Sequence, residues 1–396
     1  MATYIAACGF ECRTAGNTAA HYWNNQAAPV TDTTVFDPGG GDSSLKFTCA
    51  GALNSVGVGP LSRTAAAAVH VVRFKIRVDS MSAAGVVAQF TQGATATTTF
   101  MSWDPATSKL GVFPTGGYGT NRQNSQTLNT AQWYWVDVYL NGTNKTLDWY
   151  VDGNAQTQLS IGGSAGTYSS TPIFGCAVTE PSGSVPASGT FYIDHVGVSQ
   201  TSGDFPLTHT AIVGFVPGSD GTHNTGAAGN FTNGTTNITN ATTTAWTLLD
   251  ERPASSTDKV VQALDTTGLL YVEVNLNSTT EQRTPLAVDC AGTWRAASAA
   301  SAAGQVKLRD NLGATDSAIV NTTIAVTTDT WYTAMFAARP AALGAWTLSA
   351  LNALRVRLGF GTDVTPDIWF GGITVEVALR DDRVPYTPPM PPLLAH

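Results

Sequence analysis

Trp133-Tyr134-Trp135-Val136-Asp137-Val138-Tyr139-Leu140 is the stretch that decides the fold of this chain, because it has the composition of a β-strand dense in aromatic residues. The next two residues, Asn141-Gly142, are typical of a tight turn between antiparallel strands. Leu147-Asp148-Trp149-Tyr150-Val151 then has the composition of a returning strand, and Asp152-Gly153 that of a second turn. Residues 133–153 therefore predict a β-hairpin.

Alternation with a period of two recurs along the chain. In Val71-Val72-Arg73-Phe74-Lys75-Ile76-Arg77-Val78, every second residue from Val72 is apolar and the three between them are basic. Further strands are predicted at 191–198, 269–276, 305–310, 331–336, 354–360 and 373–379. Helix signals are nearly absent, and 346–353 is the best candidate for one or two helical turns. Short strands separated by Gly, Asn and Asp clusters indicate an all-β fold of antiparallel, jelly-roll-like sandwiches.

A short, turn-rich segment at 200–210 divides the chain. Each half has enough alternating strands for its own core, so we expect tandem β-sandwich domains at 1–200 and 211–380. Residues 381–396 follow as a proline-rich C-terminal arm, which cannot join the interior of a sheet. The arm either docks on a neighbouring subunit, as we expect, or is an idle tail.

The composition argues against several classes of protein. Only 12% of the 396 residues are charged, and 20 Lys and Arg leave a formal net charge of −8. This balance argues against nucleic acid as a partner, because binding to nucleic acid rests on contacts with phosphates. No apolar run approaches the roughly 20 residues that cross a bilayer, so no membrane is expected as a partner, and the N-terminus lacks the pattern of a secretory signal. A mostly neutral polar surface suits packing against neighbours, so we expect a homo-oligomer.

No metal or cofactor site is predicted. The five cysteines, at 8, 12, 49, 176 and 290, form no paired framework, and their odd number leaves at least one free thiol. The loops at 37–43 and 219–224 carry oxygen ligands that could hold Ca²⁺, but Asp and Gly there are also ordinary turn residues. Exposed aromatic residues could stack on sugar rings, and the candidates are Tyr22, Trp23, Trp103 and Tyr118.

No catalytic residue is predicted either, and the chain is expected not to be an enzyme. None of the six Glu begins the Glu-x-Asp-x-Glu run of jelly-roll glucanases, although carboxylates from separate strands remain an alternative. Gly162-Gly163-Ser164-Ala165-Gly166 matches a hydrolase nucleophile motif, but the loop residues that follow do not form the helix which that motif needs. His195 lies beside Asp194 on a predicted strand, where a surface or core histidine is the simpler interpretation.

The first half resembles the concanavalin A-like (laminin-G-like) jelly rolls. The segments that carry the resemblance are Gly9-Phe10-Glu11-Cys12, Ser44-Leu45-Lys46-Phe47, the aromatic strand at 133–140, the hairpin into 148–153 and Tyr192-Ile193-Asp194-His195-Val196. This resemblance implies a jelly-roll fold for the first half and says almost nothing about its function.

The second half resembles a domain of structural proteins of tailed bacteriophage virions. The carrying segments are Val216-Pro217-Gly218-Ser219-Asp220-Gly221, Leu249-Asp250-Glu251-Arg252-Pro253, Tyr271-Val272-Glu273-Val274, Trp346-Thr347-Leu348 and Leu351-Asn352-Ala353-Leu354. This resemblance implies a non-enzymatic particle component: a head-decoration, minor tail or fibre protein on the virion surface. Its partners would be other virion proteins and a host-surface glycan. The alternatives are a lectin-like carbohydrate-binding adhesin and, less favoured, a secreted polysaccharide hydrolase.

Overall fold

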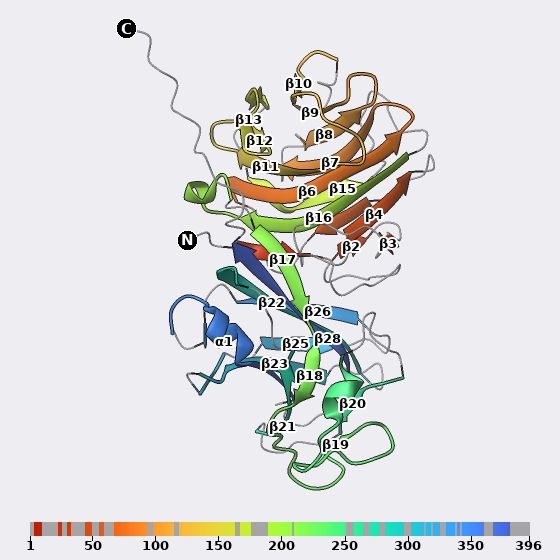
Figure 1. Ribbon diagram of the computed structural model, residues 1–396, viewed down its shortest axis with the longest axis vertical. Helices are drawn as coiled ribbons and strands as arrows, with labels where there is room; N and C mark the ends of the chain where they lie inside the picture. The colour runs from red at the N-terminus through yellow and green to blue at the C-terminus, as the bar shows by residue number, and fades with distance from the viewer. Residues whose placement is uncertain are drawn as a thin grey trace. The chain divides into compact units, whose positions relative to one another are not determined.

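The computed structural model confirms the all-β prediction, because antiparallel strands make up most of its described backbone and its few helices are short (Figure 1). The described residues are 4–9, 23–25, 30–32, 44–49, 55–58, 67–92, 98–114, 119–162, 167–175, 189–207, 210–250, 257–263, 269–277, 282–296, 302–312, 314–317, 320–324, 330–336, 339–340, 343–359 and 367–380. They divide into two compact units, the first containing Trp23–Ala211 and the second Ile212–Leu379. No helix among these residues is long and apolar enough to span a membrane.

Two antiparallel sheets build the first unit. The nine-stranded sheet has the order β13 (Asn154–Ala155), β12 (Thr146–Val151), β11 (Trp133–Asn141), β6 (Val69–Met81), β16 (Gly189–Ser199), β4 (Ser44–Cys49), β3 (Val30–Asp32), with β1 (Tyr4–Cys8) beside β16 and β14 (Leu159–Ser160) beside β12. The seven-stranded sheet has the order β10 (Gln123–Asn124), β9 (Lys109–Pro114), β8 (Thr98–Asp104), β7 (Gly85–Gln92), β15 (Tyr168–Gly175), β5 (Ser55–Val58), β2 (Trp23–Asn25). Strands distant in sequence are neighbours, such as β6 between β11 and β16, as expected of a jelly roll rather than a meander.

The core of the first unit lies between its two sheets. Val72, Phe74 and Ile76 of β6 are buried on one face, as the alternation predicts. The Phe74 ring meets the Phe174 ring of β15, in the other sheet, edge-on with centroids 4.9 Å apart. Burying one such ring contributes about 2 kcal/mol. The two sheets therefore form a sandwich.

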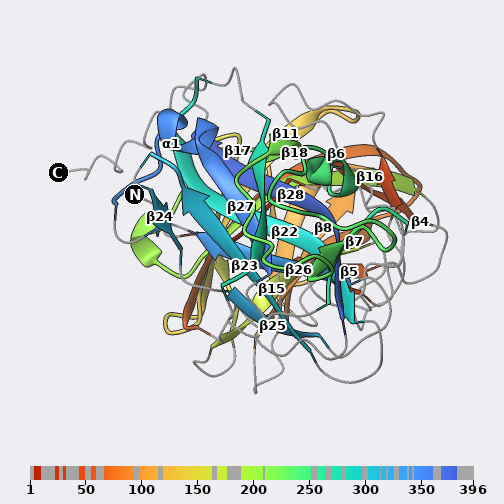
Figure 2. The ribbon, with the colours of Figure 1, turned by 90° about the horizontal axis from the view of Figure 1, so that it is seen from below.

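The second unit consists of two further antiparallel sheets of six strands each. One has the order β19 (Phe231–Thr232), β20 (Val260–Gln262), β28 (Ile368–Arg380), β22 (Pro285–Ala296), β26 (Thr330–Phe336), with β17 (Thr210–Phe215) beside β28. The other has the order β18 (Pro217–Asp220), β21 (Tyr271–Leu276), β27 (Leu354–Gly359), β23 (Ala302–Asp310), β24 (Thr315–Asp316), with β25 (Val320–Ile324) beside β23. The paired strands β27 and β23 run side by side in Figure 2.

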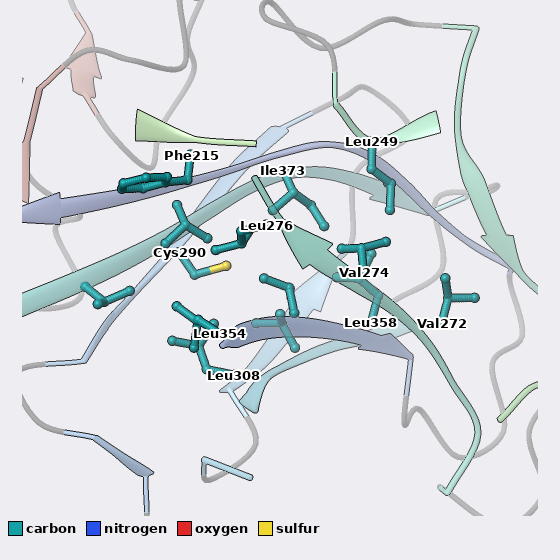
Figure 3. Close-up of a cluster of buried hydrophobic side chains, with 14 of the residues drawn as sticks. Phe215, Leu249, Val272, Val274, Leu276, Cys290, Leu308, Leu354, Leu358 and Ile373 are labelled. Atoms are coloured by element: carbon teal, nitrogen blue, oxygen red, sulfur yellow. The ribbon is translucent and has the colours of Figure 1, made fainter. Parts of the chain in front are cut away.

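Side chains from both of these sheets fill one core (Figure 3). Val274 of β21 and Leu358 of β27 lie across from Ile373 of β28 and Cys290 of β22. Cys290 is buried and is in no disulfide bond, in agreement with its interpretation as a small apolar residue. The other four cysteine side chains lie outside the described residues.

The predicted helical segment forms a single short helix, α1 (Leu348–Asn352), whose buried residues belong to this core. Its Ala350 and Leu351 are buried, and the Trp346 indole N–H just before it donates to the Phe336 carbonyl at 2.9 Å. The segment before the second unit also contains structure, a 3₁₀ turn η1 (Ser202–Asp204). Independent folding of 1–200 and 211–380 stays a prediction, and the arm at 381–396 lies outside the described residues.

Candidate functional site

The sheet that contains β21, β27 and β23 has a charged outer face. Residues one apart on a strand face opposite sides, so the buried apolar positions of these strands place the intervening polar ones on the other face. We call this surface the charged face, and its members are Glu273, Lys307, Arg309, Asp316, Arg355 and Arg357.

Glu273 is the centre of the charged face and is fully buried. Its Oε1 accepts hydrogen bonds from Arg355 Nη1 at 2.6 Å and from the Thr222 N–H at 2.8 Å. Its Oε2 accepts from Arg357 Nε at 2.6 Å. Burial alone would raise the pKa of Glu273, but the Thr222 N–H and the two guanidinium groups outweigh it and hold the pKa below its usual value.

Asp316 continues this network outward. It accepts from Arg357 Nη1 at 2.9 and 3.0 Å and from Arg309 Nη1 at 2.9 Å. The Arg357 guanidinium also lies over the Tyr271 ring, 4.2 Å from its centroid. Three guanidinium groups are thus held in place by two carboxylates and one aromatic ring.

The loop at 219–224, which the sequence offered for Ca²⁺, instead supports this network. Both carboxylate oxygens of Asp220 accept backbone N–H groups, from Ala245 at 2.9 Å and Trp246 at 2.7 Å. His223 Nδ1 accepts the Glu273 N–H at 3.1 Å, so its proton is on Nε2, which lies 3.5 Å from Asp220 Oδ2. The carboxylate of Asp220 is therefore already occupied by backbone N–H groups. The described residues contain no group of three or more His, Cys, Asp or Glu suited to a metal.

A hollow of about 300 Å³ lies at one end of the charged face. We call it the Asn/Arg hollow, and it is lined by Asn275, Asn311, Asn352, Ala353, Leu354 and Arg355. The Asn275 amide donates to the Asp220 carbonyl at 2.7 Å and to Ser219 Oγ at 3.0 Å, which leaves its oxygen to accept. Three carboxamides and one guanidinium around a small hollow can bind a ligand rich in hydroxyl groups.

The first unit has a second cluster of charged residues, on the outer face of β6 and β11. The Arg73 guanidinium lies 4.2 Å and the Lys75 ammonium 4.7 Å from the Trp135 ring centroid. Arg73 Nη1 also lies 3.4 Å from Asp137 Oδ1. Burial raises the pKa of Asp137 to about 6, against the opposing charge of Arg73.

A segment after β16 covers this first-unit cluster. The Phe205 ring stacks on the Tyr139 ring and lies tilted against the Tyr150 ring, with centroids 5.3 and 5.0 Å away. Arg73 Nη1 donates to the Leu207 carbonyl. Arg73, Lys75 and Asp137 are all buried, so this face is not open to a ligand as the Asn/Arg hollow is.

The residues singled out in the sequence have separate positions in the structure. His195 is buried at a bulge of β16, where its ring stacks on Trp135 and its Nδ1 lies 3.4 Å from Asp194 Oδ1. Trp103 is a core residue, 2% exposed, and is therefore not available for stacking on a sugar. The loop at 37–43, residues 163–166 of the hydrolase-like motif and the side chains of Tyr22, Trp23 and Tyr118 lie outside the described residues.

Paired carboxylates from separate strands, which the sequence left open, do occur. Asp289 of β22 is directly opposite Glu376 of β28, and both side chains are buried. Opposed residues of antiparallel strands have Cβ atoms roughly 5 Å apart. A search for carboxylates spaced along one strand could not find this pair, because its members lie on different strands.

No protein-family model matches this chain, and no curated protein matches it. Among solved structures, the alginate lyase Aly36B is 13% identical over 49% of this chain and 96% of its own, with a TM-score of 0.34. A Trypanosoma rangeli sialidase is 12% identical over 47% of this chain and 30% of its own, with a TM-score of 0.31. A SAP-like pentraxin from Limulus polyphemus is 14% identical over 34% of this chain and 65% of its own, with a TM-score of 0.27. These likenesses assign no ligand and no activity to this chain.

The prediction that this chain is not an enzyme is contradicted by two of these solved structures. The alginate lyase and the sialidase are enzymes. The sequence argument rested on the missing run of carboxylates along one strand, which is a single arrangement among several that catalysis can use. A β-sandwich without that run is therefore no evidence for an absence of catalysis.

Proposed function

We propose that this chain binds carbohydrate through the Asn/Arg hollow of its second unit. The observation that carries the proposal is the lining of the hollow, which brings together the carboxamides of Asn275, Asn311 and Asn352 and the Arg355 guanidinium. Sugar hydroxyls both donate and accept hydrogen bonds, and carboxamides offer both kinds of partner.

The positions of two lining residues are fixed before any ligand arrives. Arg355 is held by the buried Glu273, and Asn275 is held by Asp220 and Ser219. Side chains already held in place lose little conformational entropy on binding. This arrangement supports recognition by the hollow rather than incidental contact.

A glycan array probed with the full chain tests the proposal, followed by titration calorimetry with each glycan that binds. Asn311→Ala and Asn352→Ala should each weaken binding about tenfold, since each removes hydrogen bonds to the ligand. Asn144→Ala is the matched control, because Asn144 is exposed in the turn after β11 of the first unit. Unchanged affinity in both hollow variants, or no binding on the array, would contradict the proposal.

We further propose that the chain serves on the surface of a tailed-phage virion, where the hollow would contact a host glycan. The support comes from the sequence. The second half resembles a domain of tailed-phage structural proteins, only 12% of the residues are charged, and the chain has only six Lys, the residue that most often prevents pairing between exposed sheet edges. Electron microscopy of particles labelled with an antibody against 212–380 tests this role. Labelled particles would support it, and particles without label would contradict it.

A further inference from the structure

The charged face brings like charges directly opposite one another. Arg309 of β23 is the register partner of Arg355 of β27, and Lys307 is the register partner of Arg357. Like charges directly opposite on neighbouring strands are destabilising. The sheet tolerates two such pairs side by side, so something must offset the repulsion between them.

The two carboxylates of the face offset only part of this charge. The guanidinium groups of Arg309, Arg355 and Arg357 outnumber the carboxylates of Glu273 and Asp316 with which they pair, in a chain whose formal net charge is −8. The neighbouring Asp310 does not change this balance, because it is buried and pairs with Arg339 at 2.6 Å. The face is therefore a positive patch on an otherwise acidic protein.

Two of the cations reach solvent where the patch meets the Asn/Arg hollow. The side chains of Arg355 and Arg309 are 25% and 21% exposed, whereas the side chain of Arg357 is 10% exposed. Arg355 lines the hollow, and Arg309 lies opposite it and two residues before Asn311. An anionic group bound there would lie against both guanidinium groups.

We infer that the Asn/Arg hollow binds an acidic saccharide, whose carboxylate or sulfate group pairs with Arg355 and Arg309 while the carboxamides bind its hydroxyls. This inference rests on the proposed carbohydrate binding and names the class of sugar. A guanidinium group presents two parallel N–H donors to a carboxylate or sulfate, which gives both strength and orientation. The anion would also relieve the repulsion within the Arg309–Arg355 pair.

The test is calorimetric titration of the full chain with three sets of oligosaccharides of equal length: uronic-acid oligomers, sulfated oligomers and neutral oligomers. We expect at least one acidic set to bind about tenfold tighter than the neutral set, and this preference to shrink as salt rises from about 0.05 to about 0.5 M. The acidic set that binds tighter identifies the anionic group. Equal affinity for acidic and neutral oligomers overturns the inference but leaves the proposed function standing, whereas no binding by any set overturns both.

Arg309→Gln is the main variant, because Asp316 is partly exposed and keeps its bond to Arg357. Arg355→Gln is the second variant. Its thermal unfolding is measured alongside its affinity, because the substitution removes one partner of the buried Glu273. Each should lower affinity for the acidic oligomer about tenfold and leave affinity for the neutral one unchanged. Lys109→Gln, on β9 of the first unit, is the matched charge-removing control. A folded Arg309→Gln that keeps the full acidic preference overturns the inference.

Discussion

His70 of β6 makes the first unit sensitive to acid. Its side chain is buried, and its Nε2 lies 3.1 Å from Gln200 Nε2. An amide nitrogen only donates, so His70 Nε2 is the acceptor and the ring is neutral. Burial lowers the pKa of His70 from 6.5 to about 4.

The first prediction concerns this histidine. The unfolded chain takes up a proton near pH 6.5 and the folded chain only near pH 4, so the stability that comes from neutral His70 is present above pH 6.5 and is lost as pH falls through this window. The loss should be roughly 3 kcal/mol. His70→Gln cannot titrate and should remove it. Urea unfolding at pH 7 and pH 4.5 measures the difference, and an unchanged pH dependence in the variant would be evidence against the prediction.

The second prediction concerns Asp137 and has the opposite sign. Its pKa is raised from 3.8 to about 6, so the folded chain keeps a proton that the unfolded chain releases. The resulting stability is full below pH 3.8 and is lost as pH rises to about 6. Asp137→Asn should therefore abolish a decline in stability between pH 4 and 6, whereas Asp104→Asn, on β8 in the other sheet of the first unit, is the control. The same urea series at pH 4, 5 and 6 decides, and identical slopes in parent and Asp137→Asn would refute it.

At the scale of elements, the short helix α1 depends on Thr347, the residue just before it. The Thr347 hydroxyl oxygen accepts the Ala350 N–H at 3.1 Å, which caps the helix N-terminus. The third prediction is that Thr347→Ala lowers the free energy of unfolding by about 1 kcal/mol, while Thr347→Ser, which keeps the oxygen, costs much less. Chemical denaturation of the three proteins measures this. Equal losses in both variants would mean that the methyl group rather than the cap matters.

Alternation made most of the longer strands predictable, because the apolar positions of β6, β11, β21 and β27 all face a core. Several strands were missed, among them β7, β8, β9 and β15 of the first unit. In the missed strand β22, small residues such as Ala287 occupy the outer face and blur the period of two. Alternation also cannot tell whether a polar face is covered. The alternation predicts that Arg73 and Lys75 face away from the core, and a covering segment buries both of them.

The candidate site could not be predicted from the sequence, because no short motif contains it. Glu273, Asp316 and Arg355 come from three strands, and only the strand order β21-β27-β23-β24 brings them together. The opposed pair Arg309 and Arg355 depends on register, which a single sequence does not reveal. The sequence did supply the residues of the 219–224 loop, but as cation ligands rather than as supports for Glu273.

At the scale of the whole molecule, the segment at 200–207 belongs to the first unit and is more than a linker. The Phe205 ring packs against the rings of Tyr139 and Tyr150, and Leu207 is 1% exposed. The Ser199 hydroxyl donates to Asp204, which fixes the start of the segment. The sequence predicted only a turn-rich connection here, because the two apolar residues Phe205 and Leu207 stand among Gly, Ser and Pro, which are typical of turns.

The last prediction follows from these two apolar residues. Residues 1–211 expressed alone should be more stable than residues 1–200, because the shorter chain loses the burial of Phe205 and Leu207, worth about 3 kcal/mol or more, and exposes the charged cluster beneath them. Thermal unfolding of the two chains measures the difference. In the full chain, Phe205→Ala should reproduce part of the loss, whereas Thr201→Ala, at an exposed position of the same segment, should not. If 1–200 unfolds at the same temperature as 1–211, the segment does not stabilise the first unit, and the Tyr139, Tyr150 and Arg73 contacts do not contribute to its stability.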